Sequence, residues 1–465
     1  MIYPGQLINF ERGNDFPVKQ QLLSLFSYLK AHGVGEIEIL DLGVEIGEDI
    51  KAKEDVVEFE RRCVQLIGGY KFDIVCISCF TTFNYTASVL VGKLCREINP
   101  NANIIVGGWH GQLCPEDFLE SKGIFDFLVV GQGEKILLDI AKGKIEKNDE
   151  KTRLVYGKNL VMEDYNTFDY EFSDYILHCQ SVKNTENITT IEFNLSQQCP
   201  YDCSFCANNL LDNRKWVAFS VEKSLKQIDR AISVFENLKV VTIHDPVFGF
   251  EKKWRRKFLK ELVNRKYHVY FMMQTRLDII DEEDIELLSK INFFICFGVE
   301  ALSIEVLRAM QKTNDPDRYI RKCKENLNLL KKYNIPRQIY LLLGHPGETD
   351  QTLRETYNNL KQFLDKDIYL VVFPYYYFLP NFINNFEYYT KKYGSLIQGN
   401  LKWWKGYHSI SEVRYVPSSG ANELFEDAYK NHVERINYWG KRYYAFQKRC
   451  SIVPIIKRAK SIPEQ

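Results

Sequence analysis

The sequence predicts an α/β protein with two parallel sheets, one in each half of the chain, followed by a region of different character. Three observations support this fold class. Short runs rich in β-branched and aromatic residues alternate with amphipathic helical patterns, the alternation is interrupted once near residue 145, and it is lost after about residue 378. Because parallel strands need a long crossover connection, such alternation indicates βαβ units. We therefore expect a Rossmann- or flavodoxin-like domain, a partial (β/α)6 barrel of the TIM type, and an irregular, mostly helical C-terminal cap.

Residues 1–145 form the first predicted domain. Its strand-like runs span 36–42, 73–80, 103–110 and 125–131, and its clearest helical patterns span 17–33 and 86–98. Two of the strands end in glycine-bearing turns, Gly107-Gly108 and Gly131 to Glu134. Ligands of open parallel sheets bind beyond the carboxyl ends of the strands, where glycine lets the backbone approach them closely. The two turns therefore indicate a ligand edge, although glycine pairs after strands also occur in turns without a ligand.

A polar and aromatic stretch at 146–187 interrupts the alternation and is typical of a linker on the surface. The second domain is predicted over residues 188–378. Its strand-like runs span 189–195, 238–245, 268–275, 293–300, 337–344 and 368–376, and its helical patterns span 220–235, 252–265, 281–291, 317–333 and 353–364. Six strand–helix units predict a partial barrel whose chemistry lies on the loops that follow the strands. Residues 379–465 form the predicted cap.

The composition limits the functional classes. Lys plus Arg and Asp plus Glu both total 61, so no net charge attracts nucleic acid or an anionic membrane. The N-terminus lacks the basic start and apolar run of a signal peptide, and no run of about 18 apolar residues predicts a membrane span. We therefore expect a cytoplasmic protein with reduced thiols. Of its twelve cysteines, most of the nine outside residues 199–206, including Cys76, Cys95, Cys296 and Cys323, are expected in the core.

Three cysteines differ from the others because they are crowded into eight residues directly after the first predicted barrel strand. The stretch "NLSQQCPYDCSFCANN" (194–209) contains the spacing Cys199-x3-Cys203-x2-Cys206. A disulfide is disfavoured in a reducing compartment. Zinc normally takes four Cys or His ligands, so a zinc site would need His178 or His244 to complete it. Thiolates also hold cubane iron–sulfur clusters, and three of them leave one iron open to another ligand.

With Phe205 before its last cysteine, the triplet resembles the signature of radical S-adenosylmethionine (radical SAM) enzymes, whose three cysteines hold a [4Fe–4S] cluster. Four later stretches resemble the same family in the same order: "TIHDPVFGFEKKW", "MQTRLD", "FGVEALSIEVLRAMQK" and "LLLGHPGET". The resemblance implies that Cys199, Cys203 and Cys206 bind the catalytic cluster. It also implies a set of SAM-side residues: Phe205, Asp245, Gln274, Arg276 and Glu300. Asp245 and Glu300 could instead be structural acids that cap a helix or pair with a lysine, and Arg276 could form an ion pair at the barrel rim.

The first domain, from "DIVCISCF" to "LVVGQGE", resembles the cobalamin-binding domain that is fused to many radical SAM proteins. The resemblance places the corrinoid beside Ser78, Thr81, Gly107, Gly108, His110, Gly131, Gly133 and Glu134. The motif D-x-H-x-x-G, which supplies a histidine to cobalt in other cobalamin proteins, is absent. At His32 the H-x-x-G spacing is present, but Lys30 stands where Asp belongs. We therefore expect cobalamin to bind without a histidine ligand, while His110 could approach the corrin or be a solvated loop residue.

Together the two resemblances imply a cobalamin-dependent radical SAM enzyme with a [4Fe–4S] cluster, SAM and methylcobalamin as cofactors. The favoured reaction is methylation of an unactivated carbon in a natural-product or peptide substrate through a 5′-deoxyadenosyl radical. Non-methylating radical chemistry, such as ring formation, ring contraction or oxidation, is the alternative, and a non-catalytic sensor is a more remote one. Flavodoxin or ferredoxin would supply electrons, and no nucleic-acid or membrane partner is expected. Tyr376 and His408 are the candidate substrate-side residues, and the sequence does not identify the substrate.

Overall fold

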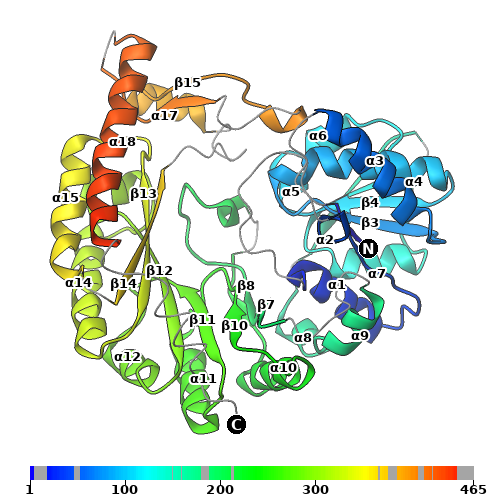
Figure 1. The fold of residues 1–465 in the computed structure, drawn as a ribbon, viewed down its shortest axis with the longest axis horizontal. Coiled ribbons are helices and arrows are strands. Elements are labelled where there is room, and N and C mark those ends of the chain that lie inside the picture. Colours follow the sequence, from blue (N-terminus) through cyan, green and yellow to red (C-terminus); the bar gives the residue numbers. More distant parts are fainter. Residues whose placement is uncertain are drawn as a thin grey trace. The chain divides into compact units, whose positions relative to one another are not determined.

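The computed structural model describes residues 1–4, 18–46, 53–148, 150–158, 160–179, 188–210, 214–364, 367–374, 385–406, 413–420 and 423–447. Contacts within the chain divide it into two compact units. The first unit comprises residues 1–188, 229–236 and 402–412, and the second comprises residues 189–228, 237–401 and 413–465. Each unit contains one six-stranded parallel sheet (Figure 1). The sequence predicts the parallel sheet in both halves of the chain, but only four of the strands of the first one.

The sheet of the first unit has the strand order β2-β1-β3-β4-β5-β6. Its strands are β1 (Ile2–Tyr3), β2 (Leu40–Asp41), β3 (Ile74–Ser78), β4 (Asn103–Gly107), β5 (Phe127–Gly131) and β6 (Arg153–Gly157). The helices described in this unit are α1 (Gln20–Ala31), α2 (Leu42–Ile46), α3 (Lys53–Ile67), η1 (Thr82–Asn84), α4 (Tyr85–Ile98), α5 (Trp109–Leu113), α6 (Pro115–Leu119), α7 (Glu134–Ala141), α8 (Met162–Tyr165) and α9 (Phe172–His178). The predicted α/β domain with a parallel sheet is therefore confirmed.

The structure differs from the prediction over residues 146–187, which were expected as a linker. Strand β6 lies in this range and extends the sheet beside β5, and helices α8 and α9 follow it. Arg153 and Tyr156 of β6 are exposed. An edge strand with exposed side chains lacks the apolar run by which a strand is recognised in a sequence. The first unit therefore continues well beyond residue 145.

The sheet of the second unit has the order β14-β13-β12-β11-β10-β7 and is curved as in a partial barrel (Figure 1). Its strands are β7 (Thr190–Phe193), β10 (Val240–Ile243), β11 (Tyr270–Thr275), β12 (Phe293–Glu300), β13 (Arg337–Leu343) and β14 (Ile368–Pro374), and each coincides with a predicted run. The helices between them are α10 (Val221–Val234), α11 (Lys252–Arg265), α12 (Glu282–Leu288), α13 (Ile304–Ala309), α14 (Pro316–Lys332) and α15 (Asp350–Leu360). Helices α11, α12, α14 and α15 lie along the outer side of the sheet in Figure 1.

Short sequence signals fix where these helices begin. At α14, the Asp315 side chain accepts the Arg318 N–H at 3.0 Å, and Pro316 occupies the first helical position. At α15, the Thr349 side chain accepts the Thr352 N–H at 3.4 Å. Capping satisfies N–H groups that have no partner inside the helix. The loops after the strands consequently have fixed ends.

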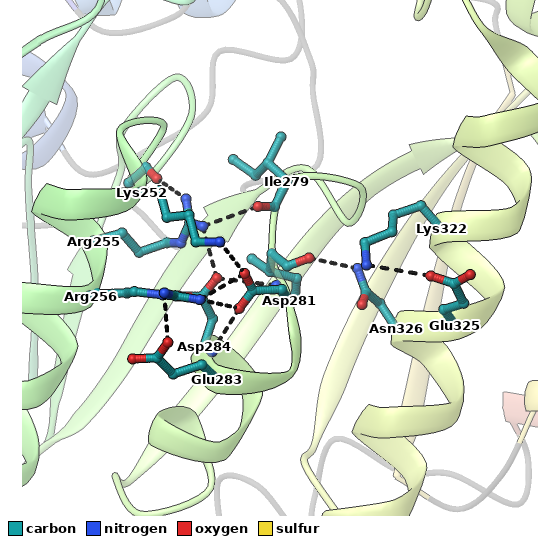
Figure 2. Close-up of polar contacts among 12 residues, drawn as sticks. Lys252, Arg255, Arg256, Ile279, Asp281, Glu283, Asp284, Lys322, Glu325 and Asn326 are labelled. Carbon is teal, nitrogen blue, oxygen red and sulfur yellow. Dashed lines mark hydrogen bonds and ion pairs between the residues drawn. The ribbon is translucent and has the colours of Figure 1, made fainter.

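A polar cluster fastens three outer helices to the loop after β11 (Figure 2). Arg255 of α11 donates to the carboxylate of Asp284 of α12 at 2.8 Å and to the carbonyl of Ile279 at 3.1 Å. Asn326 of α14 donates to the carbonyl of Leu277 at 2.7 Å. Arg255 and Asp284 are buried, and removing one member of a buried ion pair leaves an uncompensated charge. The cluster therefore holds in place the loop that begins with the functional residues described below.

The residues after β14 form the predicted cap only in part. They contain α17 (Phe386–Tyr393), β15 (Leu396–Gln398), η5 (Trp403–Lys405), β16 (Arg414–Val416) and the long helix α18 (Phe425–Gln447). Strands β15 and β16 pair in antiparallel fashion, and α18 packs against β14 and β16. Helix η5, in contrast, belongs to the first unit. Among the described residues, no helix combines the length and apolar character needed to cross a bilayer.

The cysteines predicted to lie in the core mostly do so. Cys95, Cys296 and Cys323 are buried, whereas Cys76 is half-buried. Burial raises the pKa of the Cys296 thiol to about 12, which keeps it protonated at neutral pH. These thiols therefore behave as small apolar side chains.

Candidate functional site

The cysteine loop, residues 199–206, lies at the carboxyl end of β7. It is framed by a short antiparallel pair, β8 (Ser196–Gln197) and β9 (Val217–Ala218). Cys203 is buried, and Cys199 and Cys206 are half-buried. The Cys206 N–H donates to the Cys203 carbonyl at 3.0 Å, so the chain turns tightly between these two thiols. The three cysteines thus lie on the loop after the first barrel strand, where the sequence predicts the chemistry.

Asp245, two residues after the end of β10, holds the residues that lead from β7 into this loop. Its carboxylate accepts the N–H of Leu195 at 2.8 Å, and the N–H and hydroxyl of Ser196 at 2.9 and 2.6 Å. Asp245 is 2% exposed, and burial raises its pKa to about 7 despite these hydrogen bonds. These hydrogen bonds give Asp245 a structural role, but to the chain after β7 and not as the helix cap or lysine partner that the sequence offered as the alternative. Its contact with SAM stays a prediction.

Arg276, directly after β11, reaches the cysteine loop. Its Nη1 lies 3.9 Å from Cys203 Sγ, and its guanidinium lies 3.7 Å from the centre of the Tyr201 ring. Asp278 holds the guanidinium from the other side, with Nε–Oδ1 and Nη2–Oδ2 distances of 2.9 and 3.0 Å. A bidentate pair fixes both the position and the orientation of the guanidinium. The expected ion pair is present, and it directs a positive charge at the thiols.

Glu300 ends β12 with a φ of 60°, a left-handed conformation that is uncommon for a residue with a long side chain. Its carboxylate lies 2.5 Å from Nζ of Lys312, and both side chains are nearly buried. The Lys312 Nζ lies 5.8 Å from the centre of the Phe205 ring, and Phe205 packs against the apolar cluster around Met310. The lysine pair that the sequence allowed for Glu300 is therefore present. It brings a second positive charge to the cysteine loop.

Ser204 ties the middle of the loop to two further elements. Its N–H donates to the Met310 carbonyl at 2.9 Å, and its hydroxyl lies 3.3 Å from Nε2 of His345, which follows β13. His345 is fully buried, and burial lowers its pKa to about 4, so the ring is neutral at neutral pH. The ring of Tyr389 of α17 packs against it, with centroids 6.3 Å apart. Met310 after α13 and His345 after β13 therefore anchor the loop, and Tyr389 of α17 packs against His345.

The surroundings of the three thiols fit an iron–sulfur cluster. Burial raises the pKa of all three, and Lys312 opposes this effect at each thiol. Arg276 likewise lowers the pKa of Cys199 and Cys203. Positive charges near thiolates stabilise the deprotonated form that binds iron. Two residues, Arg276 after β11 and Lys312 after α13, thus supply compensating positive charge at the cluster site.

A zinc site would need four Cys or His ligands close together. Within the described ranges, no three His, Cys, Asp or Glu side chains lie close enough to hold a single metal ion. Of the two histidines considered for zinc, His178 pairs with Glu38 in the first unit, and His244 lies 3.5 Å from Glu192.

The remaining predicted residues outside the first domain are Gln274, Tyr376 and His408. Gln274 lies on β11 opposite Cys296 of β12, with an exposed side chain. Tyr376 and His408 lie outside the described residues. Two residues that the sequence analysis did not single out, Lys312 and His345, contact the loop or its neighbours. Lys312 is the last residue of the stretch "FGVEALSIEVLRAMQK", and His345 lies in "LLLGHPGET". The motifs therefore contained both residues.

The carboxyl edge of the first sheet brings together several of the predicted cobalamin-side residues. Ser78 at the end of β3 pairs with Gly107 of β4, and Gly131 ends the next strand, β5. Gly108 has a φ of 113°, and a Cβ there would overlap the carbonyl oxygen of Cys79. Glycine is thus required by the backbone at Gly108. The small residues at these strand ends leave an edge of the kind that binds ligands in such sheets.

His110 is fully buried, although a solvated loop position was one of its predicted alternatives. Its Nε2 lies 3.4 Å from the Asp117 carboxylate, and its Nδ1 lies 3.3 Å from the hydroxyl of Thr82. Burial lowers its pKa, while Asp117 opposes this effect. The prediction of a solvated histidine is therefore wrong, because the short helix α5 turns the ring into the unit. Both ring nitrogens are directed at neighbours within the protein.

Two other predicted residues are also engaged inside the first unit. Thr81 precedes η1, where its N–H donates to the side chain of Asn84 at 2.9 Å. Glu134, at the start of α7, is buried and accepts the hydroxyl of Ser24 at 2.9 Å. Gly133 lies directly before it and is half-buried. Thr81 and Glu134 thus have structural partners, and their contact with a corrinoid stays a prediction.

Comparisons with protein families agree with this arrangement. Residues 193–360 match the radical SAM superfamily, and residues 17–141 match the B12 binding domain. This chain combines a radical SAM domain with a B12-binding domain. A radical SAM domain implies a [4Fe–4S] cluster and SAM, and a B12-binding domain implies cobalamin. The protein is therefore a radical SAM enzyme whose cluster ligands are expected on the cysteine loop.

Individual relatives are distant. An uncharacterized methyltransferase of Pyrococcus horikoshii is 23% identical over 386 residues, covering 78% of this chain and 79% of that protein. The anaerobic magnesium-protoporphyrin IX monomethyl ester cyclase of Rubrivivax gelatinosus is 24% identical over 366 residues, covering 72% of this chain and 60% of the cyclase. The structure of the radical SAM methyltransferase TsrM from Kitasatospora setae aligns with a TM-score of 0.62 at 14% identity, covering 79% and 72% of the two chains. The last likeness shows a shared fold.

Proposed function

We propose that this radical SAM enzyme uses cobalamin to methylate an unactivated carbon of a small-molecule or peptide substrate. The observation that carries the proposal is the presence of both cofactor domains in one chain, with the cysteine loop at the carboxyl end of the barrel strands. Methyl transfer is supported by the methyltransferases among the proteins that the chain resembles, the Pyrococcus horikoshii protein and TsrM. The substrate itself is not identified by these likenesses.

When bound, the cluster would supply the electron that cleaves SAM, and cobalamin would supply a carrier for the methyl group. The residues of this chain hold and orient these groups. We assign Cys199, Cys203 and Cys206 as cluster ligands. Arg276 and Lys312 place positive charge beside the thiolates. Within the loop, Cys203 is buried, which limits the access of water to this thiol.

The edge formed by Ser78, Gly107, Gly108 and Gly131 is our proposed cobalamin side of the first unit. Its support is the match of residues 17–141 to the B12 binding domain and the general position of ligands at the carboxyl ends of parallel strands. We further propose a cytoplasmic protein that receives electrons from a flavodoxin or ferredoxin. Neither nucleic acid nor a membrane is needed as a partner, in line with the balanced charge.

A second candidate is a non-methylating radical reaction on the same cofactors. It is supported by the likeness to the magnesium-protoporphyrin IX monomethyl ester cyclase, which is named for ring formation. The two candidates make different demands on SAM. Methyl transfer consumes SAM as a methyl donor and as a radical source, whereas a non-methylating reaction needs only the radical source.

The products formed from SAM distinguish the two candidates. The full chain would be reconstituted anaerobically with iron, sulfide and hydroxocobalamin, and then incubated with SAM and titanium(III) citrate. Methyl transfer predicts both S-adenosylhomocysteine and 5′-deoxyadenosine, and omission of cobalamin should remove only the former. Formation of 5′-deoxyadenosine without S-adenosylhomocysteine would favour the second candidate. Absence of both products from cluster-loaded protein would contradict the proposed function.

A further inference from the structure

A short segment late in the chain belongs to the first unit. The tryptophan strap, residues Lys402–Gly406, follows the barrel in sequence and lies outside the region that matches the B12 binding domain. Contacts nevertheless assign it to the first unit, together with residues 1–188. Trp403 and Trp404 are its anchors, with exposed fractions of 1% and 0%. Two fully buried tryptophans represent a large apolar contact area, so this is no incidental surface contact.

The strap is held by a buried carboxylate. Asp117 of α6 accepts the indole N–H of Trp404 at 2.6 Å, and its other oxygen lies 2.7 Å from Nζ of Lys405. Thr86 of α4 donates its hydroxyl to the Trp404 carbonyl at 2.7 Å. The Asp117 side chain is fully buried and also lies 3.4 Å from Nε2 of His110. Burial alone would raise the pKa of Asp117, but hydrogen bonds from His110, Lys405 and Trp404 hold it below its ordinary value.

The place of these contacts is the carboxyl edge of the sheet. Thr86 stands in the first turn of α4, which follows β3, and the Trp403 ring lies 5.0 Å from that of Phe83 in η1. Helices α5 and α6, which carry His110 and Asp117, follow β4. The strap therefore contacts the segments that follow the two strands ending in Ser78 and Gly107. These strand ends form the proposed cobalamin side.

We propose that the tryptophan strap is part of the cobalamin-binding site and holds the segments after β3 and β4 in the arrangement that cobalamin binding requires. The inference rests on the proposed function, since it assumes that the first unit binds cobalamin. Trp404 and Lys405 act as positioning residues through Asp117. Without them the buried carboxylate would lose its two shortest partners, and Lys402, with its Nζ 3.3 Å from Asp117 Oδ1, would be the remaining contact of Asp117 with the strap.

The substitution Trp404→Phe tests the proposal because it removes the N–H that Asp117 accepts and keeps an aromatic ring. Trp439→Phe is a matched control, since Trp439 of α18 donates its indole N–H to Asp350 at 3.3 Å within the second unit. Hydroxocobalamin would be titrated into each full-length, cluster-reconstituted protein and followed by absorbance. Iron content and thermal unfolding would be measured on the same samples. We expect Trp404→Phe to weaken cobalamin binding about tenfold at unchanged iron content, and Trp439→Phe to leave it unchanged.

Lys405→Met provides a second variant if Trp404→Phe does not fold, because Lys405 is partly exposed and its removal leaves the apolar packing intact. It should also weaken cobalamin binding. Wild-type affinity in a folded Trp404→Phe or Lys405→Met protein would overturn the inference, even if the unfolding temperature were lower. Equal losses in Trp404→Phe and Trp439→Phe would overturn it as well. A wild-type protein that binds no cobalamin would reject the proposed function together with the inference.

Discussion

The carboxyl edges of the two parallel sheets are completed in different ways. In the second unit, side chains that follow β11, β12 and β13 meet at the cysteine loop after β7, and each comes from a short local motif. In the first unit, His110, Thr81 and Glu134 are engaged with neighbours, and the segments after β3 and β4 contact the tryptophan strap, residues 402–406. Both candidate sites thus lie at the carboxyl ends of parallel strands. One is built from local motifs, and the other depends on a segment that is remote in the sequence.

Because of this difference, the two sites should respond to different kinds of substitution. The cysteine loop depends on a few charged and sulfur-bearing side chains, so single substitutions should remove its function without unfolding the chain. The edge of the first unit depends on backbone conformation and packing, so substitutions there should act on affinity and stability together. Four substitutions test this contrast.

The largest effect is expected from Cys203→Ala, which removes one thiolate of the loop. We expect loss of the cluster and of 5′-deoxyadenosine formation, because two remaining thiolates hold a cubane poorly. Iron and sulfide content and SAM cleavage after anaerobic reconstitution are the measurements. Cys296→Ala is the control, since this buried thiol of β12 lies in the core and its loss should cost about 1 kcal/mol of stability. Equal iron content in the two variants would contradict the assignment of the loop cysteines as cluster ligands.

Arg276→Ala should have the next largest effect. It leaves the Asp278 carboxylate, largely buried, without its bidentate partner, which should lower the free energy of unfolding by about 3 kcal/mol. SAM cleavage should also fall, because a positive charge beside Cys203 is lost. Arg276→Lys keeps the positive charge but loses the bidentate pair with Asp278. Its free energy of unfolding and its rate of SAM cleavage should therefore lie between those of the wild type and Arg276→Ala. An Arg276→Lys protein as impaired as Arg276→Ala would show that orientation matters and charge does not.

Gly108→Ala tests the backbone dependence of the first unit. The left-handed φ of 113° and the overlap of a Cβ with the Cys79 carbonyl should lower the free energy of unfolding by about 2–3 kcal/mol and weaken cobalamin binding. Gly143→Ala is the control, because Gly143 also has a positive φ, of 67°, but open space around its Cα. Gly143→Ala should lower the free energy of unfolding by about 1 kcal/mol. Urea unfolding and cobalamin titration would check both variants, and equal costs would contradict the steric explanation.

Asp245→Asn should have the smallest effect, and one that depends on pH. The Asp245 pKa is about 7 in the native protein and close to 4 when unfolded, so the native state binds an extra proton between these values. The wild-type free energy of unfolding should therefore fall as pH rises from about 4 to about 7. Asparagine does not titrate, so Asp245→Asn should gain about 1–2 kcal/mol relative to the wild type between pH 5.5 and 8. A difference that is constant over this range would show that Asp245 is ionised throughout.

Much of the fold could be predicted because its signals are local. The six barrel strands are apolar runs of the expected length, and each was found at its predicted place. Strand β6 was missed because Arg153 and Tyr156 are exposed on an edge strand. The position of His110 was misjudged because nothing in "GGWHG" shows that α5 turns the ring inward. The tryptophan strap could not be predicted, since its partner Asp117 lies 287 residues away in the sequence.

The candidate site shows the same limit. The cysteines and Arg276 were predicted from motifs and meet in the structure, at 3.9 Å between Arg276 Nη1 and Cys203 Sγ. Asp245 and Glu300 were found in the right region, but their hydrogen-bond partners, Ser196 and Lys312, depend on how separate loops pack together. A sequence motif identifies the residue type that a site needs, whereas the partner that holds it is set by tertiary packing.

The most direct test of the account is electron paramagnetic resonance of the anaerobically reconstituted, reduced protein with and without SAM, together with metal analysis. We predict about four irons and four sulfides per chain, and a cluster signal that changes when SAM is added, since SAM would bind the iron that has no cysteine ligand. Protein that contains zinc but neither iron nor sulfide, or a cluster whose signal is unaffected by SAM, would contradict the assignment of Cys199, Cys203 and Cys206.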